Sequence, residues 1–162
     1  MWGADRVGIK ISPFTAYGDN VDSNPLELFA YFLGELSKKN ILFVEGSGWG
    51  EDGYKHPEDC KVEFKNGSCS YSLRKYFNGM WVANGGFTQE SGQKAIDDDA
   101  ADMISYGSLA VANPDLPEKF EKGLPLYSMA NMDPKDASRL LYGPGETASD
   151  GYTELKFYAP KE

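Results

Sequence analysis

Short apolar runs alternate with helical patterns along most of this chain, and this alternation constrains the fold more than any other feature. Strands are expected over residues 6–12, 41–44, 80–83 and 101–106. Helices are expected between and after them, over residues 25–39, 70–77, 88–98 and 109–113. Strands that alternate with helices form a parallel sheet with right-handed crossovers. The pattern therefore predicts an α/β fold and leaves two architectures open: a small doubly wound sheet, or half of a (β/α)8 barrel.

The clearest single element is the helix expected over residues 25–39. Its apolar residues recur at spacings of three and four, Pro25 suits a first turn, and two lysines close the last turn. Residues 45–68 are polar and rich in glycine, so we expect a loop there, with a hairpin turn at Asn66-Gly67. Further helices are expected over residues 116–122, capped by Gly123, and over residues 134–141, followed by a turn over residues 143–151.

Composition excludes several classes of function. The chain of 162 residues is long enough for one domain with a core, and its formal net charge of −9 repels nucleic-acid backbones. No apolar run approaches the roughly 20 residues that span a bilayer, and the N-terminus has no apolar signal-peptide core. We therefore expect a cytoplasmic protein that binds neither nucleic acid nor membrane. Cys60 and Cys69 are interpreted as reduced thiols without metal-ligand spacing, and His56 as a loop residue.

The strongest signals for a ligand site follow the third and fourth expected strands. Gly85 and Gly86 lie between a strand and a helix, and so does the pair Gly107-Ser108. Glycine lets backbone approach a ligand closely, and a helix start offers N–H groups to an anion. Barrel enzymes often hold a phosphate with the loops after their last two strands. A phosphate cup and two tight turns without a ligand are both compatible with these residues.

Lys10 is a charge within an otherwise apolar expected strand. Its neighbours Ile9 and Ile11 point to the opposite face. A lysine in such a place is either paired, directed into a polar cavity, or long enough to reach solvent. By contrast, Ser12 and Ser105 have no histidine partner by motif, so a hydrolase triad is not indicated.

Several of these motifs, in this order, resemble those of the old yellow enzyme family of flavin oxidoreductases. Residues 2–14 (WGADRVGIKISPF) are similar to the family's fifth-strand motif, and residues 85–90 (GGFTQE) to its seventh. Residues 102–107 (DMISYG) and 112–117 (ANPDLP) are similar to the eighth strand and its tail. Residues 123–126 and 151–153 complete the C-terminal signature.

The resemblance implies the C-terminal half, (β/α)4, of a TIM (β/α)8 barrel: strands five to eight with a C-terminal extension, as a single partial domain over residues 1–162. It implies flavin mononucleotide (FMN) as cofactor, NAD(P)H as reductant and activated alkenes of the enone type as substrates. Lys10 stands where the family has an arginine beside the flavin ring, and it keeps the charge while losing the planar fork. Gly85, Gly86 and Gly107 would face the FMN phosphate.

Two departures from the family pattern accompany the resemblance. Ser108 replaces an arginine that grips the phosphate, so we expect FMN to be retained more weakly by about 1–3 kcal/mol. The histidine/asparagine or histidine/histidine pair that binds the substrate oxygen and the tyrosine that donates the proton are expected before residue 1, so no catalytic residue is assigned. We therefore expect the isolated chain to be inactive, and to self-associate or to pair with a missing N-terminal half. The alternative is a catalytically dead half barrel that serves as a binding or interaction module.

Overall fold

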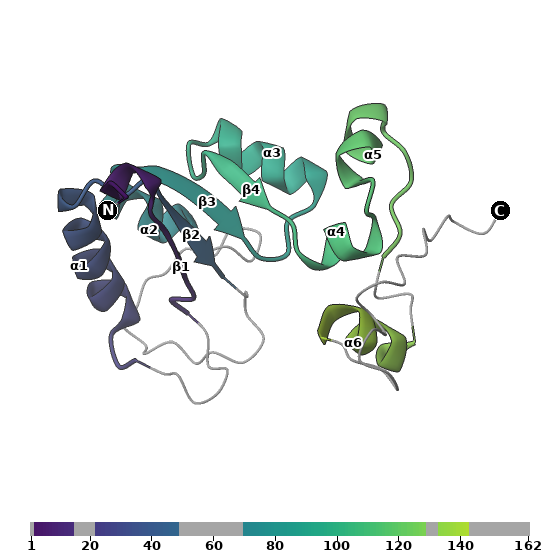
Figure 1. Ribbon diagram of the computed structural model, residues 1–162, viewed down its shortest axis with the longest axis horizontal. Coiled ribbons are helices and arrows are strands. Elements are labelled where there is room, and N and C mark those ends of the chain that lie inside the picture. The colour runs from purple at the N-terminus through teal and green to yellow at the C-terminus, as the bar shows by residue number, and fades with distance from the viewer. Residues whose placement is uncertain (1, 15–21, 49–69, 129–132, 143–162) are drawn as a thin grey trace. The chain divides into compact units, whose positions relative to one another are not determined.

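A computed structural model describes residues 2–14, 22–48, 70–128 and 133–142 (Figure 1). The chain divides into two compact units, Met1–Ser105 and Tyr106–Glu162. The first unit contains a four-stranded parallel sheet in the order β1-β2-β3-β4. The expected hairpin at residues 66–67 and the turn over residues 143–151 lie outside the described residues.

Helices connect the neighbouring strands of this sheet. A short 3-10 helix, η1 (Ala4–Arg6), precedes β1 (Gly8–Ile11), and α1 (Pro25–Lys38) leads to β2 (Phe43–Ser47). The segments α2 (Ser70–Leu73) and η3 (Arg74–Tyr76) lead to β3 (Met80–Asn84), and α3 (Gln89–Asp97) leads to β4 (Met103–Ser105). The predicted alternation of strand and helix is confirmed.

Local signals in the sequence explain where the two longer helices begin. At α1 the Asn24 side chain accepts a hydrogen bond from the backbone N–H of Glu27, and Pro25 occupies the first turn. At α3 the Thr88 and Ser91 side chains each bond the other's backbone N–H, which completes a capping box with serine in the place of the usual glutamate.

The two faces of the sheet differ sharply in burial. One face carries Val44, Trp81 and Ala83, all fully buried, and the Trp81 indole donates to the Ser70 hydroxyl of α2 at 2.8 Å. The core of this unit therefore lies between that face and the helices. Met80 and Met103 belong to the opposite face, and they are 39% and 51% exposed. This second face, which we call the open face, is the one that points inward when such a sheet closes into a barrel.

The second unit is helical in the part that the structure describes. It contains α4 (Ser108–Ala112), α5 (Leu116–Lys122) and α6 (Pro134–Tyr142), and Gly123 ends α5 in the left-handed conformation, with a φ of 61°. Asn113 is fully buried between α4 and α5. Its amide donates to the carbonyls of Leu109 and Tyr127, and its oxygen accepts from the Tyr127 N–H and the Lys119 ammonium, so its polar atoms are satisfied.

One boundary that bears on function differs from the prediction. The second strand was expected over residues 41–44, with a loop from residue 45, but β2 runs from Phe43 to Ser47. Glu45, Gly46 and Ser47 pair in register with Val82, Ala83 and Asn84 of β3. Polar residues and glycine disfavour a strand in isolation. Ladder bonds to β1 and β3 on both sides override that preference.

Candidate active site at the carboxyl ends of the strands

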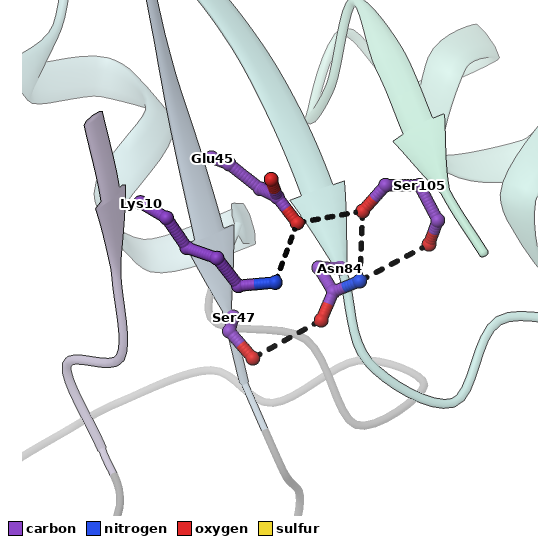
Figure 2. Close-up of polar contacts among 5 residues, drawn as sticks. All are labelled: Lys10, Glu45, Ser47, Asn84 and Ser105. Atoms are coloured by element: carbon purple, nitrogen blue, oxygen red, sulfur yellow. Dashed lines mark hydrogen bonds and ion pairs between the residues drawn. The ribbon is translucent and has the colours of Figure 1, made fainter. Parts of the chain in front are cut away.

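A row of polar side chains crosses the open face near the carboxyl ends of all four strands (Figure 2). The sheet register sets their positions: Lys10 pairs with Glu45, while Ser47, Asn84 and Ser105 form one rank across three strands. Residues that are in register in a parallel sheet point to the same face. Glu45 and Ser47 are two positions apart on β2, so both ranks lie on one face. We call these five residues the polar row, and they come from segments that are far apart in the sequence.

The polar row is tied together by hydrogen bonds. Glu45 Oε1 accepts from Lys10 Nζ at 2.8 Å and from Ser105 Oγ at 2.9 Å. The Asn84 amide nitrogen donates to Ser105 Oγ at 2.7 Å and to the Ser105 carbonyl at 3.2 Å. Ser47 Oγ donates to Asn84 Oδ1 at 3.1 Å. The network thus links β1, β2, β3 and β4 side chain to side chain.

Lys10 combines two of the situations considered from sequence. It is paired, because its ammonium contacts Glu45, and it also reaches solvent, because its side chain is 54% exposed. The Glu45 side chain is only 21% exposed. A cation with a fixed partner therefore stands at the carboxyl end of the sheet, where ligands bind in barrel enzymes.

Sequence reasoning missed Glu45 and Ser47 as site residues, and it considered Asn84 only as the first residue of the turn with Gly85 and Gly86. Glu45 was placed in a loop, and Ser105 was considered only for a hydrolase triad. One signal could have identified Glu45 and Ser47. Phe43, Glu45 and Ser47 alternate with Val44 and Gly46, as expected for a strand whose two faces differ in burial. The run is too short, and too poor in β-formers, to stand out.

The two glycines in the turn after β3 both have positive φ angles, but their surroundings differ. Gly85 has a φ of 118°, and a Cβ there would lie 2.0 Å from the carbonyl oxygen of Gly48, so neighbouring backbone alone excludes a side chain. Gly86 has a φ of 67°, but nothing described lies within 4 Å of its virtual Cβ. Gly85 therefore has a structural role, while Gly86 leaves open space at the turn.

Gly107 and Ser108 belong to the second unit. Gly107 precedes α4, and its virtual Cβ also meets nothing within 4 Å among the described residues. Ser108 is exposed and begins α4, which has no side-chain cap. Because the two glycine turns lie in different units, a phosphate cup formed by both stays a prediction.

Other kinds of site are not seen in the part of the chain that the structure describes. No group of three or more potential metal-ligating side chains comes together there. None of the helices in those segments has both the length and the apolar character needed to cross a membrane. His56, Cys60 and Cys69 fall outside those segments.

A four-stranded parallel sheet in sequential order, with one face buried under helices and a polar row near the strands' carboxyl ends, is the arrangement expected for part of an α/β barrel. The chain belongs to the NADH:flavin oxidoreductase / NADH oxidase family, whose model matches residues 1–127.

Curated relatives agree with this assignment. The chain is 39% identical over 129 residues to putative 12-oxophytodienoate reductase 3 of Oryza sativa subsp. japonica. It is 41% identical over 124 residues to a 12-oxophytodienoate reductase-like protein of Solanum lycopersicum. Each alignment covers 76% of this chain but only 31% and 30% of the relative. The chain thus spans about a third of the length of the curated relatives it matches.

Solved structures establish the architecture. Morphinone reductase matches with a TM-score of 0.71 at 28% identity, over 95% of this chain and 37% of that protein. The old yellow enzyme homologue from Zymomonas mobilis matches with a TM-score of 0.62 at 29% identity, over 79% of this chain and 36% of that protein. Both the resemblance to old yellow enzymes and the predicted fold, the (β/α)4 C-terminal half of a TIM barrel, are confirmed.

Proposed function

We propose that this chain carries the flavin- and phosphate-binding half of an FMN-dependent ene-reductase that uses NAD(P)H to reduce activated alkenes. The observation that supports it most is the polar row, with Lys10 on the carboxyl end of the sheet, in a chain of a flavin oxidoreductase family. The chemistry that FMN supplies when bound is transfer of a hydride from the nicotinamide to the alkene.

The residues present fit the cofactor unevenly. Lys10 offers a cation to the flavin ring, and such a charge favours the reduced, anionic flavin. Gly86 in the first unit and Gly107 in the second each have no described atom within 4 Å of the Cβ position, so each turn by itself leaves its backbone open to a phosphate among the described residues. Ser108 supplies at most one hydrogen bond to that phosphate, without charge. The fit therefore supports a retained flavin-ring contact and a weakened phosphate grip.

We propose further that the isolated chain does not turn over substrate. The family's substrate-binding pair, histidine/asparagine or histidine/histidine, belongs to the half of the barrel before strand five, and the single histidine of residues 1–162, His56, matches none of the family motifs. A substrate bound to this half alone would lack the hydrogen bonds that polarise its carbonyl.

Flavin titration tests the proposal directly. Purified chain is mixed with FMN, and bound flavin is measured by its visible absorbance after removal of free ligand. We expect binding, followed by no reduction of an enone with NADPH under anaerobic conditions. The absence of bound flavin at high FMN concentration would refute the binding role, and enone reduction would refute inactivity.

The open face favours the alternative role, an interaction module. Met80 and Met103 expose apolar surface there, and β1 and β4 are the two edge strands of the described sheet. Apolar faces and free parallel edges promote pairing with another sheet. We propose that the chain self-associates, or pairs with a polypeptide that supplies the other strands of a barrel. Light scattering over a range of concentrations tests the first arm, and a stable monomer at high concentration would contradict self-association.

A further inference from the structure

Glu45 is the centre of the polar row, although the proposed function does not use it. Its Oε1 accepts hydrogen bonds from the Lys10 ammonium on β1 and from the Ser105 hydroxyl on β4. The Ser105 hydroxyl oxygen in turn accepts a hydrogen bond from the Asn84 amide at 2.7 Å. The carboxylate is therefore held from the β3–β4 side of the sheet while it holds a lysine on the β1 side (Figure 2).

Packing does not order the Lys10 ammonium. Its side chain is 54% exposed, and the flexible lysine stem keeps many rotamers open at such a position. Glu45 is the more rigid partner, because it is less exposed and is anchored by Ser105. Among the described residues, Glu45 is the one acidic side chain in ion-pair contact with Lys10.

We propose that Glu45 is a positioning residue that fixes the Lys10 ammonium at the carboxyl end of the open face, where it meets the flavin ring. The inference rests on the proposed function, since the flavin is what Lys10 would contact. Glu45 has two opposing effects on an anionic ligand. Its charge repels the anion, while its ion pair orders the cation that attracts it. The change in flavin affinity in Glu45→Gln therefore distinguishes the two effects: weaker binding indicates positioning, and tighter binding indicates charge repulsion.

The first test needs no flavin. In the full chain labelled with 15N, the Lys10 ammonium is identified by the signal lost in Lys10→Met. We expect a protected, slowly exchanging ammonium signal in the unmodified chain and loss of that protection in Glu45→Gln. The matched control is Glu35→Gln, which removes an equal charge from the exposed Glu35–Lys38 pair of α1 and leaves the Lys10 signal unchanged. An unchanged Lys10 signal in Glu45→Gln would overturn the inference.

The second test measures flavin affinity by fluorescence quenching. We expect Glu45→Gln to bind FMN up to about fivefold more weakly, the factor set by an ion pair worth up to about 1 kcal/mol. Riboflavin, which has no phosphate, is expected to lose the same factor because the contact is to the ring. In a Lys10→Met background, Glu45→Gln should have no further effect, since Glu45 acts through Lys10.

The outcomes separate the two proposals. Tighter flavin binding by Glu45→Gln, or an equal loss in the Lys10→Met background, would overturn positioning while leaving the proposed function in place. If the unmodified chain binds no flavin, the proposed function fails, and the ammonium signal alone decides whether Glu45 fixes Lys10. Urea unfolding of each variant identifies any change that reflects loss of fold.

Discussion

Replacing Ser108 with arginine tests the expected weak point of the cofactor site. Ser108 is exposed at the start of α4, so a longer side chain there can extend from the surface of the described residues. A new charge-assisted bond to a phosphate is worth about 1–3 kcal/mol. Because the position is exposed, solvent screening favours the lower part of that range. We therefore expect Ser108→Arg to lower the Kd for FMN by roughly tenfold, the factor that corresponds to about 1.4 kcal/mol.

The assay is a fluorescence titration with FMN and with riboflavin at low and high salt. The gain should appear with FMN alone, because riboflavin has no phosphate, and it should shrink as salt rises. Ser108→Gln controls for side-chain size without charge, and Glu35→Gln, on α1 of the other unit, controls for an equal change in net charge. A gain of equal size with riboflavin, or in Ser108→Gln, would refute the reasoning that Ser108 marks a missing phosphate cation.

Three further predictions concern stability. Gly46→Ala should lower the free energy of unfolding in urea by about 1–3 kcal/mol, because its Cβ would lie 2.3 Å from the buried Trp81 ring. Gly34→Ala, in mid-helix with no described atom within 4 Å of its Cβ position, should raise it by up to about 1 kcal/mol. Equal effects of the two substitutions would contradict the packing argument. Asn113→Ala should cost about 2–4 kcal/mol, because it removes a fully buried amide and its two hydrogen bonds to the Tyr127 backbone, and a loss below 1 kcal/mol would show that water replaces those bonds. Burial, followed by the hydrogen bond to Asp98, raises the pKa of Tyr71 above its ordinary value of 10.0. The stability that the neutral phenol contributes is therefore fully present below pH 10 and is lost as pH rises further, and Tyr71→Phe should flatten this fall in thermal melts.

The sequence was sufficient wherever a local rule acts alone. The apolar spacing of α1 with Pro25 at its start, the Thr88 cap of α3 and the Gly123 stop of α5 depend on residues within one turn of each other. The order of motifs was equally informative, because a family's residues at several successive strand ends specify one barrel. Four strands and their crossovers followed from these signals.

The site depended on contacts that no local rule contains. Sequence identified Lys10 as an unusual charge but placed its partner Glu45 in a loop, since residues 45–47 form a strand only through their ladder bonds to β1 and β3. The two residues lie 35 positions apart, and Ser105 lies a further 60 from Glu45. Likewise, Gly85 and Gly86 look alike in sequence, and only the approach of Gly48 separates a structural glycine from one with open space.

The sequence by itself thus determined the alternation of strands and helices and the family, and it singled out Lys10 as an unusual charge in a strand. The tertiary structure decided how that charge is held, with Glu45 between Lys10 and Ser105. The physical reason is that hydrophobic periodicity and capping act over a few residues, whereas the register of a parallel sheet juxtaposes side chains from separate crossovers.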